Sequence, residues 1–266
     1  MPARIAIPMP HSLDPEYAER AIPQYERAVT LAGGEPVRVA LDLSPDQITK
    51  IMQRCDGVLL PGSKADVDPA RYAAARSPHT AAADLRRDTV DNLLLENAYK
   101  LRKAVLGICY GLQSLNVYRA GSLVQHIPDF LPEATRAKVN HEAGKNVAVA
   151  HTVGIDRASK LAEIVAVEVR SPQSDVQDPL VVPVNSSHHQ SADENKIGDG
   201  LRIVARCTDD GIIEALEGTA PDHFVLAVQW HPERSVEADA ASLAIFRAFI
   251  DIAGERCGEL GGAVIP

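Results

Sequence analysis

The sequence predicts an α/β fold built around a central, mostly parallel sheet. Its first half alternates short apolar runs with longer amphipathic segments, which is the pattern of strand–helix–strand units. Its second half carries shorter runs typical of strands and ends in one amphipathic helix, which indicates that the same sheet continues. We therefore expect a single domain over residues 1–253, followed by a glycine-rich tail at residues 254–266 that frays.

Strands and helices are expected to alternate strictly in the first part of the chain. Gly33 and Gly34 are placed to end the first helix, while Ser44 and Pro45 supply the N-cap and the first helical position of the second. Pro23 lies inside the first helical pattern, where it should kink the helix or shift its start. In chain order, the expected strands are residues 4–9, 36–40, 57–60 and 104–106, and the expected helices are residues 16–31, 44–54 and 82–102.

After residue 120 the apolar runs become shorter, and the chain is expected to add strands to the same sheet. Residues 128–145 lack such a pattern and are interpreted as an irregular loop. A last helix is expected at about residues 237–253. The strands expected in this half are residues 147–155, 164–169, 181–184, 201–206, 212–217 and 224–230.

Composition and charge narrow the class of partner. Of the 266 residues, 45% are hydrophobic and 24% charged, as in ordinary globular chains, and the formal net charge is −9. Nucleic-acid binding depends on clustered Lys and Arg, so we expect a small-molecule partner and no nucleic acid. No segment reaches the roughly 18 apolar residues of a membrane span, and the N-terminus has no signal-peptide pattern. We therefore expect no membrane partner and a cytoplasmic location.

A glycine-flanked turn, Gly107-Ile108-Cys109-Tyr110-Gly111, joins an apolar strand to a helical pattern. A turn of this kind presents a nucleophile, because the glycines let the strand and the helix approach closely. At the positive end of a helix a thiol is driven toward the reactive thiolate, and the N–H of Tyr110 is left to face an oxyanion. The alternative is that Cys109 is a small core side chain.

The other three cysteines carry no such turn. Cys55, Cys207 and Cys257 are therefore interpreted as small apolar side chains. Four cysteines are too few for a disulfide scaffold, and none form a close pair of the zinc-binding type.

His231-Pro232-Glu233 follows the expected strand at residues 224–230 and supplies a candidate base with its carboxylate. Residues two apart in an extended segment project to the same side, so His231 and Glu233 can meet. A carboxylate on one imidazole nitrogen orients a base for a nucleophile. The alternatives are a solvated pair, a metal-binding pair, or a different base at His188 or His189.

Five segments together resemble the class I glutamine amidotransferase superfamily and, within it, the peptidase C26 family of γ-glutamyl hydrolases. The turn around Cys109 and the run from Gln229 to Glu233 are each fairly specific, and their joint occurrence is much more so. In chain order, the segments are residues 59–63 with 66–69, 107–113, 121–125, 185–190 and 228–233.

The resemblance implies a flavodoxin-like three-layer sandwich and a role for eight residues. It makes Cys109 the nucleophile, His231 the base and Glu233 its orienting carboxylate, gives the oxyanion hole to the N–H groups of Gly62 and Tyr110, and makes Gln113, Ser187 and His188 candidates for substrate binding. For Gln113, packing within its own helix is the alternative. The chain departs from the family pattern at Tyr110, where Arg is common, and this departure leaves the identity of the substrate open.

These assignments predict a hydrolase that cleaves the γ-amide of a γ-glutamyl substrate, of the γ-glutamyl-γ-aminobutyrate kind, to glutamate and a free amine through a thioester. Such chemistry needs no metal and no other cofactor, and polyamine breakdown fits the resemblance. One alternative is a glutaminase subunit that supplies ammonia. Because the chain has no P-loop, the synthetase that uses this ammonia would be a separate protein. Another is a silent binding or scaffold protein. The oligomeric state stays open, with a homodimer as one option.

Overall fold

The computed structural model describes residues 1–166 and 178–261. Over these residues it contains one sheet of nine strands, which we divide by strand direction. The parallel half consists of β1 (Arg4–Pro8), β2 (Glu35–Val39), β3 (Gly57–Leu60), β4 (Ala104–Ile108) and β11 (Val225–Val228). The antiparallel half consists of β6 (His151–Ile155), β7 (Leu180–Val184), β9 (Leu201–Cys207) and β10 (Ile213–Gly218).

The order of the strands brings three of the predicted site segments to one edge of the sheet. That order is β2-β1-β3-β4-β11-β10-β9-β6-β7, so the two halves meet where β11 pairs with β10. In the parallel half, Leu60 pairs with Gly107, and Ile108 pairs with Val228. The carboxyl ends of β3, β4 and β11 are therefore level, and the chain that leaves each of them emerges at the same edge, where α/β proteins place their sites.

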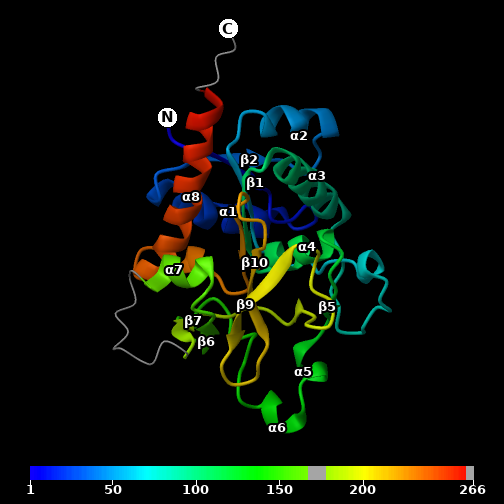
Figure 1. Cartoon of the computed structure of the whole chain (residues 1–266). Helices are drawn as coiled ribbons and strands as arrows, with labels where there is room; N and C mark the ends of the chain where they lie inside the picture. The colour runs from blue at the N-terminus through cyan, green and yellow to red at the C-terminus, as the bar shows by residue number, and fades with distance from the viewer. Residues whose placement is uncertain (167–177, 262–266) are drawn as a thin grey trace.

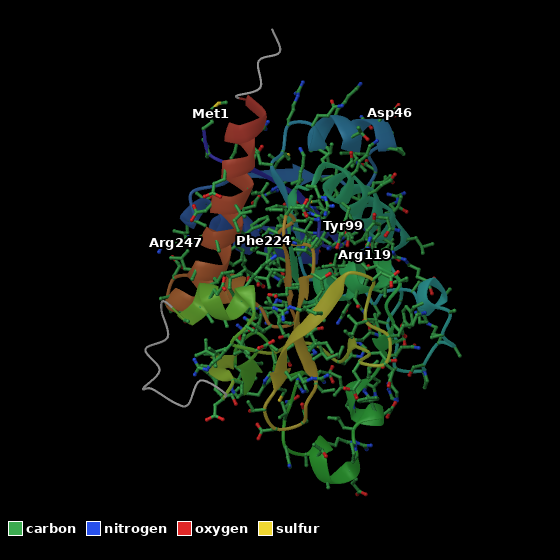
Figure 2. The ribbon with its side chains drawn as sticks, in the orientation of Figure 1. Met1, Asp46, Tyr99, Arg119, Phe224 and Arg247 are labelled. Atoms are coloured by element: carbon green, nitrogen blue, oxygen red, sulfur yellow. The ribbon has the colours of Figure 1, made fainter. Side chains whose placement is uncertain are left out.

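Helices cover both faces of the sheet (Figure 1) and bury two separate apolar cores against it. One core contains residues of α1 (Pro15–Leu31), α7 (Lys160–Ala166) and α8 (Ala240–Gly261), and the other contains residues of α2 (Pro45–Met52), α3 (Leu85–Leu101) and α4 (Tyr110–Tyr118). Figure 2 shows Tyr99 of α3 near Arg119, which follows α4 and places its guanidinium 4.6 Å from the Tyr99 ring centroid. The predicted α/β sandwich is confirmed, with a mixed sheet whose core is parallel.

The start of α2 illustrates how local sequence places these helices. Ser44 is its N-cap and accepts a hydrogen bond from the N–H of Gln47, whose side chain accepts in turn from the N–H of Ser44. This reciprocal pair satisfies two donors that a helix leaves unpaired, and Pro45 needs no such partner because it has no N–H.

The remaining elements are short and surround the carboxyl edge of the sheet. They are β5 (Leu123–Val124) paired with β8 (Ser191–Ala192), the helices α5 (Ile127–Phe130) and α6 (Glu133–Arg136), and the 3₁₀ turns η1 (Pro69–Tyr72) and η2 (Pro232–Arg234). None of the described helices is both long enough and apolar enough to cross a membrane.

Three expectations for the second half of the chain are wrong. Residues 164–166 end helix α7 and are not part of a strand, because Leu161, Ala162 and Val165 recur at helical spacing and are all buried; residues 167–169 lie outside the described residues. The predicted loop at 128–145 contains α5 and α6. Helix α8 continues to Gly261, well beyond the expected end at residue 253, and Gly254 packs close to Ala3.

In the first half of the chain, Pro23 lies inside α1, which begins at Pro15 with no shift of its start.

Candidate active site

Cys109 occupies the sharp turn between β4 and α4 that the sequence predicts. Its backbone has φ 54° and ψ −106°, a conformation that costs a non-glycine residue energy and that clusters at functional sites. The turn is held by a hydrogen bond of 2.8 Å from the N–H of Cys109 to the carbonyl of Val228 on β11. The thiol is largely buried at the head of α4.

The flanking glycines are required by the close approach of strand and helix. A Cβ on Gly111 would lie 2.2 Å from the carbonyl oxygen of Leu60, and one on Gly107 would lie 2.9 Å from the backbone of Gly111. Neither position has room for a side chain, since the obstructing atoms are backbone. The sequence pattern therefore encodes a steric requirement of the turn.

His231 and Glu233 meet beside Cys109. The Nδ1 of His231 lies 2.7 Å from Oε1 of Glu233, and the imidazole lies beside the Cys109 side chain. The backbone between His231 and Glu233 is not the predicted extended segment, because residues Pro232–Arg234 form the 3₁₀ turn η2. Proline at the first position of a helical turn fixes φ at a helical value, which explains the difference.

The electrostatic surroundings of His231 favour its charged form. Burial lowers the pKa of the imidazole, but its electrostatic and hydrogen-bonding interactions with Glu233 and Cys109 outweigh burial and raise the pKa to about 9. An imidazolium against a sulfur is the arrangement that activates thiol nucleophiles. This geometry sets His231, and not His188 or His189, beside the sulfur.

Gly62 and Tyr110 both border the thiol, as the oxyanion assignment requires. A Cβ on Gly62 would lie 3.1 Å from Cε1 of His231 and 3.6 Å from Cβ of Cys109. Tyr110 is the first residue of α4, so its N–H has no acceptor within the helix. The N–H of Gly62, however, donates to the hydroxyl of Tyr25 at 3.0 Å, a partner that the sequence did not indicate.

A buried arginine fixes the loop that carries Gly62. Arg87 is fully buried, donates to the carbonyl of Pro61 at 2.7 Å and pairs with Asp91 at 2.6 Å. Its guanidinium lies 4.9 Å from the ring centroid of Tyr110. The four-residue spacing of Arg87 and Asp91 on a helix was the available signal for this pair, although burial turns a weak surface contact into a structural one.

The side chain of Tyr110 packs against α3. Its hydroxyl donates to Oδ1 of Asp88 at 2.6 Å, and burial raises its pKa well above the usual value. The departure from Arg at this position therefore changes the packing against α3.

The three predicted substrate-binding residues each have partners within the protein. Gln113 is buried and donates to the carbonyl of Gln190 and to Oε1 of Gln229, at 3.3 and 3.4 Å. Ser187 accepts a hydrogen bond of 2.8 Å from Arg234. His188 belongs to a buried cluster with His141, His151 and Glu214 that sequence spacing did not indicate.

Asn185 belongs to the segment of residues 185–190, but the sequence assigned it no role. Its side-chain amide donates to the carbonyl of His231 at 2.8 Å, and its oxygen accepts from the N–H of His231 at 2.9 Å. Both bonds are buried, so the amide fixes the backbone of the histidine on both sides.

The described cysteines other than Cys109 fit the expected core role. Cys55 and Cys207 are buried, and burial raises their pKa values to about 11 and about 12. Thiols of this kind are unreactive near neutral pH. The side chain of Cys257 lies outside the described residues.

Comparison with known proteins identifies the family. The Peptidase C26 family model matches residues 8–233. A glutamine amidotransferase-like protein of Rickettsia prowazekii is 31% identical over 89% of both chains. A γ-glutamyl-γ-aminobutyrate hydrolase of Escherichia coli is 30% identical over 85% of this chain and 84% of its own.

Solved structures share the fold at lower identity. A GMP synthase component of Thermoplasma acidophilum superimposes with a TM-score of 0.61 at 15% identity, covering 98% of each chain. The glutaminase domain of a Trypanosoma brucei CTPS, solved with bound acivicin, gives a TM-score of 0.59 at 20% identity, covering 95% of this chain and 94% of its own. The family match spans most of the chain, and both relatives reach at least 30% identity over most of their length, so the protein belongs to the peptidase C26 family of glutamine amidotransferase-like hydrolases.

Proposed function

We propose that the protein hydrolyses the γ-amide bond of a γ-glutamyl amine, with Cys109 as nucleophile. The observation that carries the proposal is the contact of the Cys109 side chain with His231, whose other ring nitrogen lies 2.7 Å from Glu233. That arrangement supplies a nucleophile, a proton carrier and an orienting carboxylate in one buried unit.

The chemistry proceeds in two steps. The sulfur of Cys109 attacks the γ-carbonyl, the oxygen becomes an oxyanion, and His231 protonates the nitrogen as the C–N bond breaks and the free amine departs. Water then loses a proton to His231 and attacks the thioester, the C–S bond breaks, and glutamate leaves. Glu233 keeps the imidazole oriented through both steps, and each step returns the proton taken by the other.

The N–H of Tyr110 and the N–H of Gly62 are the proposed oxyanion donors. Tyr110 N–H needs no rearrangement, since it begins α4. Gly62 N–H must exchange the Tyr25 hydroxyl for the oxyanion. Because burial raises the pKa of Tyr25 well above its usual value, that residue stays a neutral hydroxyl and can turn to another partner.

The proposal also concerns the identity of the amine that leaves. The E. coli relative named as a γ-glutamyl-γ-aminobutyrate hydrolase supports an amine that carries its own carboxylate, and such a substrate would place the reaction in polyamine breakdown. The relatives named as glutamine amidotransferases support the second candidate, a glutaminase subunit working with a separate synthetase. The two candidates share the thiol chemistry and differ in whether an amine or ammonia leaves.

A substrate panel tests the proposal. The purified full chain is incubated with glutamine, with γ-glutamyl-γ-aminobutyrate and with γ-glutamyl derivatives of other amines, while glutamate, ammonia and free amine are followed separately. We expect equal amounts of glutamate and amine from at least one γ-glutamyl amine, with kcat/KM at least about tenfold above that for glutamine. Chain pretreated with iodoacetamide is the blank. Ammonia release from glutamine alone would favour the glutaminase subunit, and no product from any compound would overturn both.

A further inference from the structure

A second group of chemically competent side chains lies in the antiparallel half of the sheet. It consists of three histidines and one glutamate, all buried: His141 before β6, His151 at the start of β6, His188 after β7, and Glu214 on β10. The side chains are at most 3% exposed. The proposed thiol chemistry uses none of them.

The distances within this cluster are those of a coordination shell. Oε1 of Glu214 lies 3.4 Å from Nδ1 of His141, 3.4 Å from Nε2 of His151 and 3.5 Å from Nε2 of His188. These separations are long for hydrogen bonds. They match the edge of a tetrahedron with bonds of about 2.0–2.1 Å, which is roughly 3.3 Å. All four donor atoms lie within 4.8 Å of one another.

The same inward-facing atoms lack hydrogen-bond partners. Within the described residues, no partner is found for Nδ1 of His141, Nε2 of His151, Nε2 of His188 or either carboxylate oxygen of Glu214. A buried polar atom without a partner costs about 1–3 kcal/mol, and a buried charge costs more. Four of these atoms, one from each residue, lie close together, which indicates that a cation belongs between them.

The outward-facing nitrogens are each directed at an acceptor. Nε2 of His141 lies 2.9 Å from Oδ2 of Asp210, Nδ1 of His188 lies 2.9 Å from the carbonyl of Gln190, and Nδ1 of His151 lies 3.4 Å from its neighbour's carbonyl. In the neutral tautomers that donate to these acceptors, every inward nitrogen carries a lone pair. Three lone pairs facing a carboxylate repel one another, whereas metal-bound histidines use their other N–H in just this way.

We propose that His141, His151, His188 and Glu214 bind one zinc ion in a closed tetrahedral site. Three imidazoles and one carboxylate in tetrahedral array suit Zn²⁺ better than Mg²⁺ or Ca²⁺, which take oxygen ligands at higher coordination numbers. Four protein ligands fill the shell, so the ion is structural and takes no part in the thioester chemistry. This inference departs from the sequence expectation of no metal, which rested on the cysteines and on the needs of the reaction.

The site would also brace the base of the proposed reaction. His188 shares the segment of residues 185–190 with Asn185, which holds the backbone of His231 on both sides. Glu214 accepts a backbone hydrogen bond of 2.7 Å from Gln229, two residues before His231. A zinc ion would therefore tie together the two segments that position His231.

Metal content is the direct test. Chain purified without a histidine tag or chelator should contain about one zinc ion per molecule by elemental mass spectrometry. His151→Ala and Glu214→Ala should each lower this content to below about one tenth. His223→Gln is the matched control, because His223 is also buried but bonds the carbonyl of Lys103 at the opposite edge of the sheet, and it should keep the full content.

Two further measurements do not depend on those variants folding. Apoprotein prepared by chelation should take up one equivalent of Co²⁺ with the visible absorption of a tetrahedral ion. Asp210→Asn should weaken zinc binding about 10–100-fold, because it replaces the carboxylate beside the outer nitrogen of His141, while an amide oxygen can still accept from the N–H of Ile212. Wild-type protein that neither carries zinc nor takes up one equivalent after chelation would overturn the proposal, as would equal zinc content in the His151 and His223 variants. Absence of zinc from the wild-type protein, before and after chelation, would instead indicate that the cluster is a network of charged histidines.

Discussion

In the parallel half of the sheet, Gly62, Cys109 and His231 follow the ends of three level strands, whereas the polar cluster of the antiparallel half comes from strands and loops alike. Parallel strands end at a common edge, so strand direction alone brings together the residues that follow them. Neighbouring antiparallel strands have their carboxyl ends at opposite edges of the sheet. There, Glu214 sits where the pairing of β10 with β9 shifts register between Ile213 and Ala215. An irregularity of this kind re-aims a side chain, so convergence in this half depends on strand pairing.

The thiols of the two halves give the largest contrast. Cys109→Ala should lower kcat by about 10⁴-fold or more, because the nucleophile is lost, with the free energy of unfolding changed by less than about 1 kcal/mol. Cys207→Ala, in the antiparallel half, should leave kcat nearly unchanged and cost about 1 kcal/mol of stability by opening a small cavity. Steady-state kinetics on the best substrate of the panel and urea unfolding measure both quantities. Substantial turnover by Cys109→Ala would remove the functional distinction between the halves.

Replacing the orienting carboxylate should have the next largest effect. Glu233→Gln should lower kcat by about 10²–10⁴-fold, because the amide no longer stabilises the imidazolium and can hold the ring in the wrong tautomer. The matched control is Glu194→Gln, which removes an exposed carboxylate paired with Arg206 in the antiparallel half. The control should change kcat little, since exposed ion pairs contribute at most about 1 kcal/mol. Equal losses in the two variants would contradict the assignment of Glu233.

The same variant should change how stability depends on pH. The pKa of His231 is raised to about 9 in the folded chain, against an ordinary value of 6.5. A raised histidine pKa stabilises the folded state fully below the unfolded value, and this stabilisation is lost as the pH rises through the folded value. The difference in unfolding free energy between wild type and Glu233→Gln should therefore be largest below pH 6.5 and shrink toward pH 9. Urea titrations across that range measure it, and a constant difference would contradict the charge pairing.

The same contrast explains how far the sequence could predict this molecule. The glycine-flanked turn around Cys109 and the pairing of His231 with Glu233 were predictable, because each depends on a few adjacent residues and on the shared edge of parallel strands. The 3₁₀ geometry at Pro232 and the hydrogen bond of Tyr25 to Gly62 were not, since each is decided by packing between distant elements.

The antiparallel half was harder to predict in both fold and site. Residues 164–166 are an apolar run too short for periodicity to separate strand from helix. The sequence motifs did not indicate the cluster that His188 forms with His141, His151 and Glu214. These four residues have no common spacing, and strand pairing together with loop hydrogen bonds, such as that from the N–H of His188 to the carbonyl of His141, brings them together.

Asn185 offers the smallest but most specific test, because it joins the halves. It follows β7, yet its amide holds both the N–H and the carbonyl of His231. Asn185→Ala should cost about 2 kcal/mol of stability by leaving these buried groups unpaired, and should lower kcat roughly tenfold by loosening the base. Asn195→Ala is the control, since its amide bonds only Asp193 in an exposed turn.

The decisive readout separates positioning from mere folding. At a temperature where Asn185→Ala is fully folded, the loss should appear in kcat with KM within about threefold of wild type, because the assigned role of Asn185 is to position the backbone of His231. The pH–rate profile should also shift, since a displaced imidazole no longer shares the charges of Glu233 and Cys109 that raise its pKa. An unchanged kcat in the folded variant would mean that the parallel half holds His231 without help from the antiparallel half.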